Sequence, residues 1–149
     1  MTLALSLQVK NYDCGLTVYG NAMRIMGVDL SWDECKVLVG TTSRGGTTRA
    51  GMIRGIKSSG FDAVAYKQRK TEPSWRWIRK WLKTNPVILL VDDDQHWVLA
   101  AGNSNGHVII IDPTADVKKA QNGVLLMDKT DLSFRWKHAV HYAILVKRR

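Results

Sequence analysis

The stretch HWVLAAGNSNGHVIIIDP, residues 96–113, decides the fold of this chain. It holds two apolar runs on either side of NSNG, and turns between hairpin strands are rich in Asn and Gly. The spacing therefore predicts two antiparallel strands, with His96 at the start of the first and Asp112 just after the second. Both residues then lie at the same end of the sheet, nearly equidistant from the turn. A carboxylate in that place can accept the Nδ1–H of the imidazole and stabilise its charged form.

Further apolar runs continue the sheet on both sides of this hairpin. FDAVAY (61–66), PVILLV (86–91) and HAVHYAILV (138–146) are short, apolar and bounded by polar residues, which predicts strands. In the last run the alternation of a strand places His138 and His141 on opposite faces. Between the first two runs, PSWRWIRKWL (73–82) predicts a short helix.

The first sixty residues have the period of helices instead. Three segments with apolar residues at helical spacing each end at a glycine: residues 14–27, 31–40 and 47–60. Ser31 followed by Glu34 forms a capping-box pattern, and Thr47 or Thr48 is a cap for the third segment. Helices followed by an antiparallel sheet predict an α+β fold. At 149 residues, with no linker or repeat, we expect one domain over residues 1–149.

Composition limits the class of protein. The apolar runs are too short to span a membrane, no secretion signal is recognisable, and two cysteines make no disulfide framework, so we expect a cytoplasmic protein.

Lys and Arg number 22 against 13 Asp and Glu, a formal net charge of +9. These basic residues are scattered and no nucleic-acid-binding motif accompanies them. We therefore favour a solvated basic surface over a dedicated nucleic-acid-binding face.

Cys14 is the candidate nucleophile. It lies in the first turn of the first predicted helix, where the helix dipole and free N–H groups favour a thiolate. His96, fixed at the start of a strand, is the candidate base, and Asp112 orients it. Gln8 lies six residues before Cys14, so its amide and the Cys14 N–H can form an oxyanion hole. Cys35 lies inside an amphipathic helix without such partners, and we expect it to be packing.

The motifs QVKNYDCG, HWVLAAG and IIIDP resemble those of the bacteriocin-leader peptidases, which are papain-like cysteine peptidases that cut leader peptides after a double glycine. SWDECKVLVG, GGTT, SSGF and PVILLV extend the resemblance over almost the whole chain. It implies a papain-like fold, with Gln8 as the oxyanion glutamine, Cys14 as nucleophile, His96 as base and Asp112 as the orienting carboxylate. No transporter segment follows, so the resemblance is to a free-standing member.

The expected activity is hydrolysis of a peptide bond, after a small residue such as glycine, without metal or cofactor. Trp97 is a candidate wall of the substrate cleft, and Asp94 in the DDDQ loop is a candidate contact for a basic substrate segment. The expected partner is a peptide or protein substrate. Two alternatives stay open: other acyl chemistry on the same residues (deamidation, transglutamination, cleavage of a ubiquitin-like tail), or a non-catalytic binding module that uses the basic surface.

Overall fold

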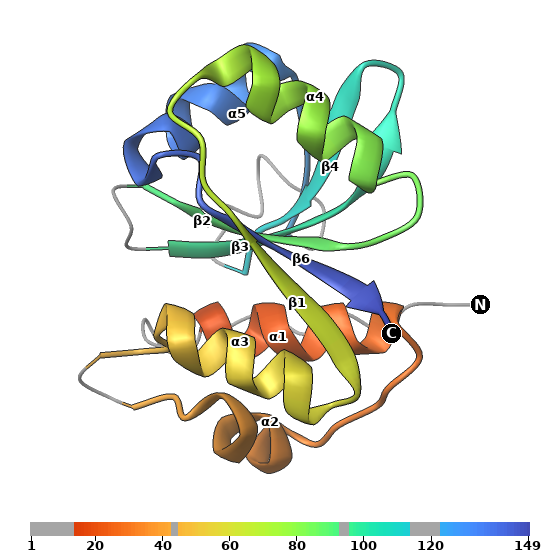
Figure 1. Ribbon diagram of the computed structural model, residues 1–149, viewed down its shortest axis with the longest axis vertical. Coiled ribbons are helices and arrows are strands. Elements are labelled where there is room, and N and C mark those ends of the chain that lie inside the picture. The colour runs from red at the N-terminus through yellow and green to blue at the C-terminus, as the bar shows by residue number, and fades with distance from the viewer. Residues whose placement is uncertain (1–13, 43–44, 93–95, 114–122) are drawn as a thin grey trace.

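The computed structural model describes residues 14–42, 45–92, 96–113 and 123–149. Three helices come first and strands dominate the rest, which confirms the α+β prediction (Figure 1). The helices are α1 (Cys14–Ile25), α2 (Trp32–Val39), α3 (Arg49–Ser58), α4 (Thr71–Trp81) and α5 (Lys129–Trp136), with a 3₁₀ turn, η2, at Lys137–Ala139. The strands are β1 (Phe61–Tyr66), β2 (Val87–Val91), β3 (His96–Ser104), β4 (His107–Ile111), β5 (Val124–Met127) and β6 (Ala143–Arg148).

All six strands join one antiparallel sheet in the order β1-β6-β2-β3-β4-β5. The predicted hairpin is β3–β4, which turns at Asn105 and Gly106, both with positive φ (47° and 79°). Positive φ at both turn residues gives a twist that matches the twist of the strands, so the NSNG signal was correct. A bulge between Ala100 and Gly102 shifts the register, and Leu99 pairs with Ile111 near the site end.

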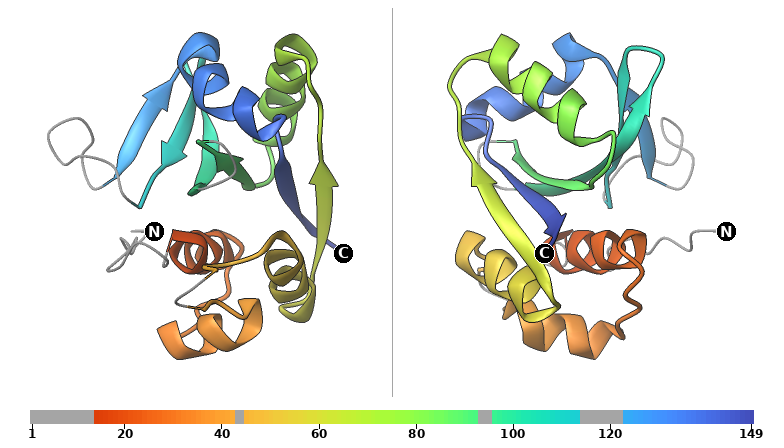
Figure 2. Two further views of the ribbon diagram at one scale, coloured as in Figure 1. Left: turned by 90° about the vertical axis from the view of Figure 1, so that its left-hand side faces the viewer. Right: turned by 45° about the vertical axis from the view of Figure 1, so that its right-hand side comes forward.

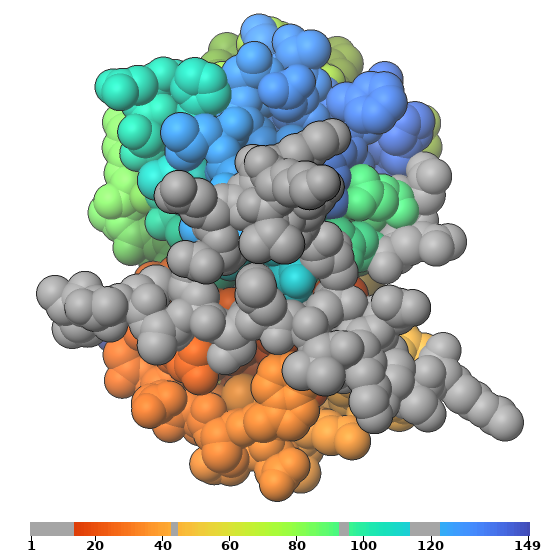
Figure 3. All heavy atoms as spheres, turned by 180° about the vertical axis from the view of Figure 1, so that it is seen from behind, coloured from red at the N-terminus to blue at the C-terminus, as the bar shows by residue number. Residues whose placement is uncertain are grey.

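The sheet separates two apolar cores because successive strand residues face opposite sides. In β3, Trp97 and Leu99 pack in the core on the side of α1–α3. Val98 and Ala100 pack in the core under α4 and α5. Figure 2 shows these two helical layers on either side of the strands. Seen from behind, α2 lies at one end of the molecule and the segment from β5 to α5 at the other (Figure 3).

The helix boundaries follow local signals in the sequence. Ser31 caps α2 in a complete capping box with Glu34, as predicted. Thr48, rather than Thr47, caps α3 through the N–H of Gly51. Among the described residues, no helix is both long and apolar enough to cross a bilayer.

The C-terminal part departs from the prediction. The predicted strand over residues 138–146 was wrong at its start, because Val140 and His141 adopt left-handed φ values of 53° and 48°, which differ from the extended backbone of a regular strand. The strand begins at Ala143, after α5 and η2. The sequence analysis also missed β5 and α5. The helix has a local signal, since the Asp128 side chain caps it by accepting from the N–H of Asp131.

Candidate active site

Cys14 is the first residue of α1, as the sequence predicted. Its side chain is buried at the end of the helix, which packs across β3. At this position the unpaired N–H groups of the first turn and the helix dipole both favour negative charge on sulfur. Cys35, in contrast, is buried within α2 in the helical core, where burial raises the pKa of its thiol. The two cysteines therefore lie in opposite electrostatic settings.

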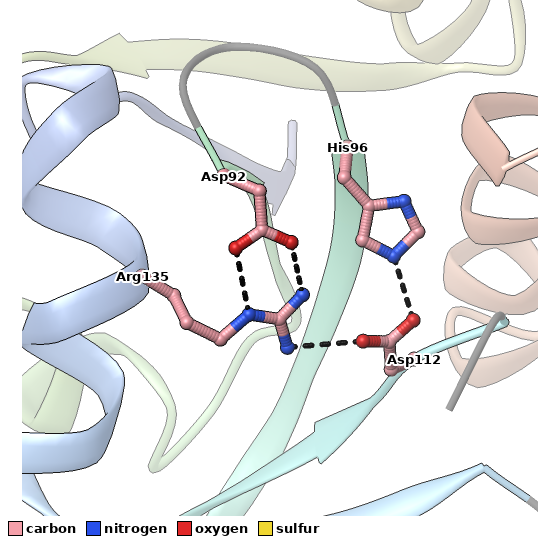
Figure 4. Close-up of polar contacts among 4 residues, drawn as sticks. All are labelled: Asp92, His96, Asp112 and Arg135. Atoms are coloured by element: carbon pink, nitrogen blue, oxygen red, sulfur yellow. Dashed lines mark hydrogen bonds and ion pairs between the residues drawn. The ribbon is translucent and has the colours of Figure 1, made fainter. Parts of the chain in front are cut away.

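His96 and Asp112 meet at one end of the sheet, where the predicted hairpin places them. His96 Nε2 lies 2.6 Å from Asp112 Oδ1, and only 6% of the Asp112 side chain is exposed. The sequence analysis assigned this contact to Nδ1, and the structure corrects it. Because the ring extends from the start of β3 with Nε2 toward Asp112, Nδ1 is left on the side of α1 (Figure 4).

The Cys14 thiol interacts with the His96 side chain, since each group shifts the pKa of the other, and His96 in turn contacts Asp112, so three of the predicted site residues lie together. Burial alone raises the pKa of the Cys14 thiol. Hydrogen bonds from His96 and the Trp97 backbone, with the charge of His96, outweigh burial and lower this pKa below its ordinary value. Burial also disfavours the imidazolium, yet the bonds to Asp112 and Cys14 raise the pKa of His96 to about 9. The arrangement favours a thiolate–imidazolium pair near neutral pH.

Trp97 lies beside this site as a buried residue. Its indole N–H donates to the carbonyl of Thr47 (3.0 Å), and the Thr47 hydroxyl contacts that of Thr41 (2.6 Å). The Trp97 ring also meets the ring of Tyr142 edge-on, with centroids 6.4 Å apart. Trp97 therefore fixes the loop before α3 against the start of β3. Its expected contact with substrate stays a prediction.

Gln8 and Asp94 lie outside the described residues. The expected oxyanion role of Gln8 and the expected substrate contact of Asp94 therefore stay predictions from the sequence.

Sequence reasoning missed two charged residues that the structure brings to this site. Arg135, from α5, donates from Nη1 to Asp112 Oδ2 (3.0 Å). It also forms a two-bond contact with Asp92 at the end of β2, Nε to Oδ1 at 3.0 Å and Nη2 to Oδ2 at 2.6 Å. Figure 4 shows the resulting row of side chains, from Asp92 through Arg135 and Asp112 to His96.

Solved structures of similar fold cover nearly the whole chain. A double glycine motif protease from an AMS/PCAT transporter, solved with its leader peptide, matches with a TM-score of 0.75 at 17% identity, over 99% of this chain and 93% of that one. The peptidase domain of Streptococcus ComA, a bi-functional ABC transporter of a quorum-sensing pathway, gives 0.77 at 23% identity, over 99% and 100%. A putative C39-like peptidase from Bacillus anthracis gives 0.68 at 12% identity, over 99% and 96%. No curated protein matches the chain significantly.

This fold is that of the papain-like cysteine peptidases, with a helical half packed against an antiparallel sheet. The model of the peptidase C39 family matches residues 2–149. The chain therefore belongs to the peptidase C39 family and is a cysteine peptidase, a hydrolase. The family expectation from the sequence motifs is confirmed.

Proposed function

We propose that the chain cleaves a leader-type peptide after a small residue, with Cys14 as nucleophile, His96 as base and acid, and Asp112 as the carboxylate that orients His96. The observation that carries the proposal is the continuous contact from the Cys14 thiol through His96 to Asp112. The thiol lies at a helix N-terminus and the carboxylate is buried, so each group has the environment its role requires.

The chemistry follows from these groups. The Cys14 thiolate attacks the carbonyl carbon of the scissile bond, and the C=O π electrons move to oxygen. The Cys14 N–H and the Gln8 amide then stabilise this oxyanion. His96, protonated at Nδ1, gives that proton to the leaving amine as the C–N bond breaks. Water, deprotonated by His96, hydrolyses the resulting thioester and restores the thiol–imidazole pair. Asp112 keeps Nε2 protonated throughout, so that Nδ1 is the nitrogen that exchanges the proton.

The proposed substrate class is a peptide with Gly-Gly before the cleaved bond. Support comes from the sequence motifs and from the similar fold of a double glycine motif protease that was solved with its leader peptide. We also propose that residues 1–149 form one domain. Within it, Trp97 lines the substrate path and Asp94 contacts basic residues of the substrate.

The first test measures alkylation of each cysteine by iodoacetamide against pH, by mass spectrometry, in wild type and in His96→Ala. Cys14 should react with a midpoint below the ordinary thiol pKa of about 8.5, because His96 stabilises the thiolate. The variant should lose this early reactivity. Cys35 is the internal control and should react slowly in both proteins. A Cys14 that titrates as an ordinary thiol, or that ignores the loss of His96, contradicts the proposed pair.

The pH dependence of cleavage follows from the same pair. Activity should rise with pH as Cys14 loses its proton, at a pH below the ordinary thiol value. It should fall as pH passes about 9, because the imidazolium then loses the proton needed by the leaving amine.

The assay compares kcat/KM for peptides with Gly-Gly or Val-Val before the cleaved bond, and Cys14→Ala is the blank. Equal rates for the two peptides would exclude the double-glycine preference. Trapping of the acyl group by an added amine faster than by water would indicate transfer chemistry instead.

A further inference from the structure

Arg135 connects the ends of two strands to α5. Its guanidinium contacts Asp92 at the end of β2 through two hydrogen bonds and Asp112 after β4 through a third. The Arg135 side chain is 20% exposed, whereas that of Asp92 is 44% exposed. A planar guanidinium that faces two carboxylates in this way is held in one orientation. The row of contacts thus begins near the surface at Asp92 and ends at the buried Cys14.

Asp112 has a separate partner for each carboxylate oxygen. Oδ1 contacts His96 Nε2 and Oδ2 accepts from Arg135 Nη1. With both oxygens engaged, the carboxylate plane is fixed and Oδ1 faces the ring nitrogen. Loss of the Arg135 bond would leave a buried anion with one donor fewer, and that anion would gain freedom to rotate away from His96.

Asp92 is tied to Arg135 by its backbone as well as by its side chain. Its N–H donates to the Arg135 carbonyl (3.0 Å), and its φ is 53°, a left-handed value that is unfavourable for most residues with a side chain. Asp92 directly follows β2, the strand that pairs with β3, and Val91 is directly opposite His96. Arg135 therefore holds Asp92, directly after β2, in this left-handed conformation.

We propose that Arg135 and Asp92 are positioning residues for this site: Arg135 fixes the Asp112 carboxylate against His96, and Asp92 fixes Arg135. The inference rests on the proposed function, since it assigns Asp112 the role of orienting the base. The charges of Arg135 and Asp92 also act on the pKa of His96. Arg135 adds a positive charge near the Cys14–His96 pair, and Asp92 offsets part of it.

The charges that face His96 from the described elements are Cys14 on α1 and Asp112 after β4, with Arg135 and Asp92 beyond them. Removal of the Arg135 charge alone would leave the site more negative and raise the pKa of His96. An Asp112 carboxylate that turns away loses its bond to His96, and this loss lowers that pKa. The bond to Asp112 is the foremost contribution that raises the pKa of His96, so its loss should outweigh the effect of the more distant Arg135 charge. Removal of the Asp92 charge leaves the site more positive and also lowers that pKa.

The experiment follows the His96 ring carbon by NMR in protein with ¹³C-labelled histidine, assigned with His96→Ala, over pH 5–10. Arg135→Gln and Asp92→Asn should both lower the His96 midpoint, because each loosens the contact between Asp112 and His96. Arg135→Lys keeps the charge but lacks the planar fork, so its midpoint should fall as well, and it should lose about tenfold in kcat/KM.

Arg149→Gln and Asp62→Asn are matched controls, because this pair forms an exposed ion pair elsewhere. Neither should move the His96 midpoint, and thermal melting should confirm that every variant is folded. A higher midpoint in Arg135→Gln would show an effect of charge alone and would overturn the inference, as would no shift in either variant. The NMR midpoint needs neither a substrate nor a reactive Cys14. Failure of the alkylation and cleavage tests would therefore refute the proposed function, while a raised or unchanged midpoint in Arg135→Gln would refute the positioning role.

Discussion

Gly15, directly after Cys14, has no room for a side chain. A Cβ at this position would lie 2.5 Å from Thr47 Cβ and 2.9 Å from Trp97 Cδ1. The first turn of α1 therefore packs directly on the loop before α3 and on the start of β3. This close approach brings the candidate nucleophile to the strand that carries His96. In the Asp-Cys-Gly motif, the cysteine is thus needed for chemistry and the glycine for close packing.

We expect Gly15→Ala to displace the start of α1. The added methyl cannot fit without movement of Thr47 or Trp97, so the free energy of unfolding should fall by about 1–3 kcal/mol. The early alkylation of Cys14 should be lost as well. Urea unfolding and the alkylation profile measure the two effects.

Gly20→Ala is the matched control on the same helix. A Cβ there meets only Cys35 Sγ at 3.5 Å, an ordinary contact, and alanine favours the helix. This variant should be as stable as wild type or more so, with normal Cys14 reactivity. If Gly15→Ala behaves like Gly20→Ala, the close packing at Cys14 is not required.

At the scale of elements, α2 and α3 pack closely through two glycines of α3. A Cβ at Gly51 would lie 2.3 Å from the Val39 carbonyl oxygen, and one at Gly55 would lie 2.6 Å from Val39 Cγ1. Both helices also have strong local caps, Ser31 and Thr48. The caps set where each helix begins, and the glycines set how near the two helices approach.

Gly51→Ala should separate these helices. Its neighbour is backbone, which cannot rotate away, so we expect the free energy of unfolding to fall by about 1–3 kcal/mol or more. Gly55→Ala faces a side chain that can partly adjust, and it should cost less. Urea unfolding of both variants shows which of them loses more stability. A Gly51 variant at least as stable as the Gly55 variant would contradict the rigid contact with Val39.

In the whole molecule, the sheet separates Cys14 from a basic surface on the outside of α4. This basic α4 surface consists of Arg76, Arg79 and Lys80 on the helix and Lys83 just after it. They line a hollow of about 380 Å³ with Trp75 and Asn103, and no carboxylate of the described residues lines it. The Arg79 guanidinium lies over the Trp75 ring at 5.5 Å. Because α4 and α1 cover opposite faces of the sheet, this surface and Cys14 lie on opposite sides of it (Figure 2).

We expect the basic α4 surface to bind polyanions only weakly. Fluorescence anisotropy of a labelled single-stranded oligonucleotide should show binding at 50 mM salt that is lost near 150 mM, since it depends on counterion release. Replacing the four basic residues with Gln should reduce the salt dependence, and Cys14→Ala should leave it unchanged. Tight binding at 150 mM salt that the α4 variant abolishes would make nucleic acid a partner.

Several elements could be predicted from the sequence because their signals are local. The β3–β4 hairpin depends on a short turn between two apolar runs, so the approach of His96 to Asp112 followed from spacing alone. The capping box of α2 and the start of α1 at Cys14 are equally local. The apolar run over residues 138–146 misled the prediction, because left-handed backbone at Val140 and His141 has no simple residue signature.

The fold class followed from the periods and short spacings of the sequence, and the family followed from motifs that resemble those of its members. The fold in three dimensions was needed to show that β6 inserts between β1 and β2, that Nε2 rather than Nδ1 contacts Asp112, and that Arg135 reaches this carboxylate from α5. These features join segments far apart in the chain. Such contacts depend on how all the apolar faces are buried together, and no local pattern encodes that choice.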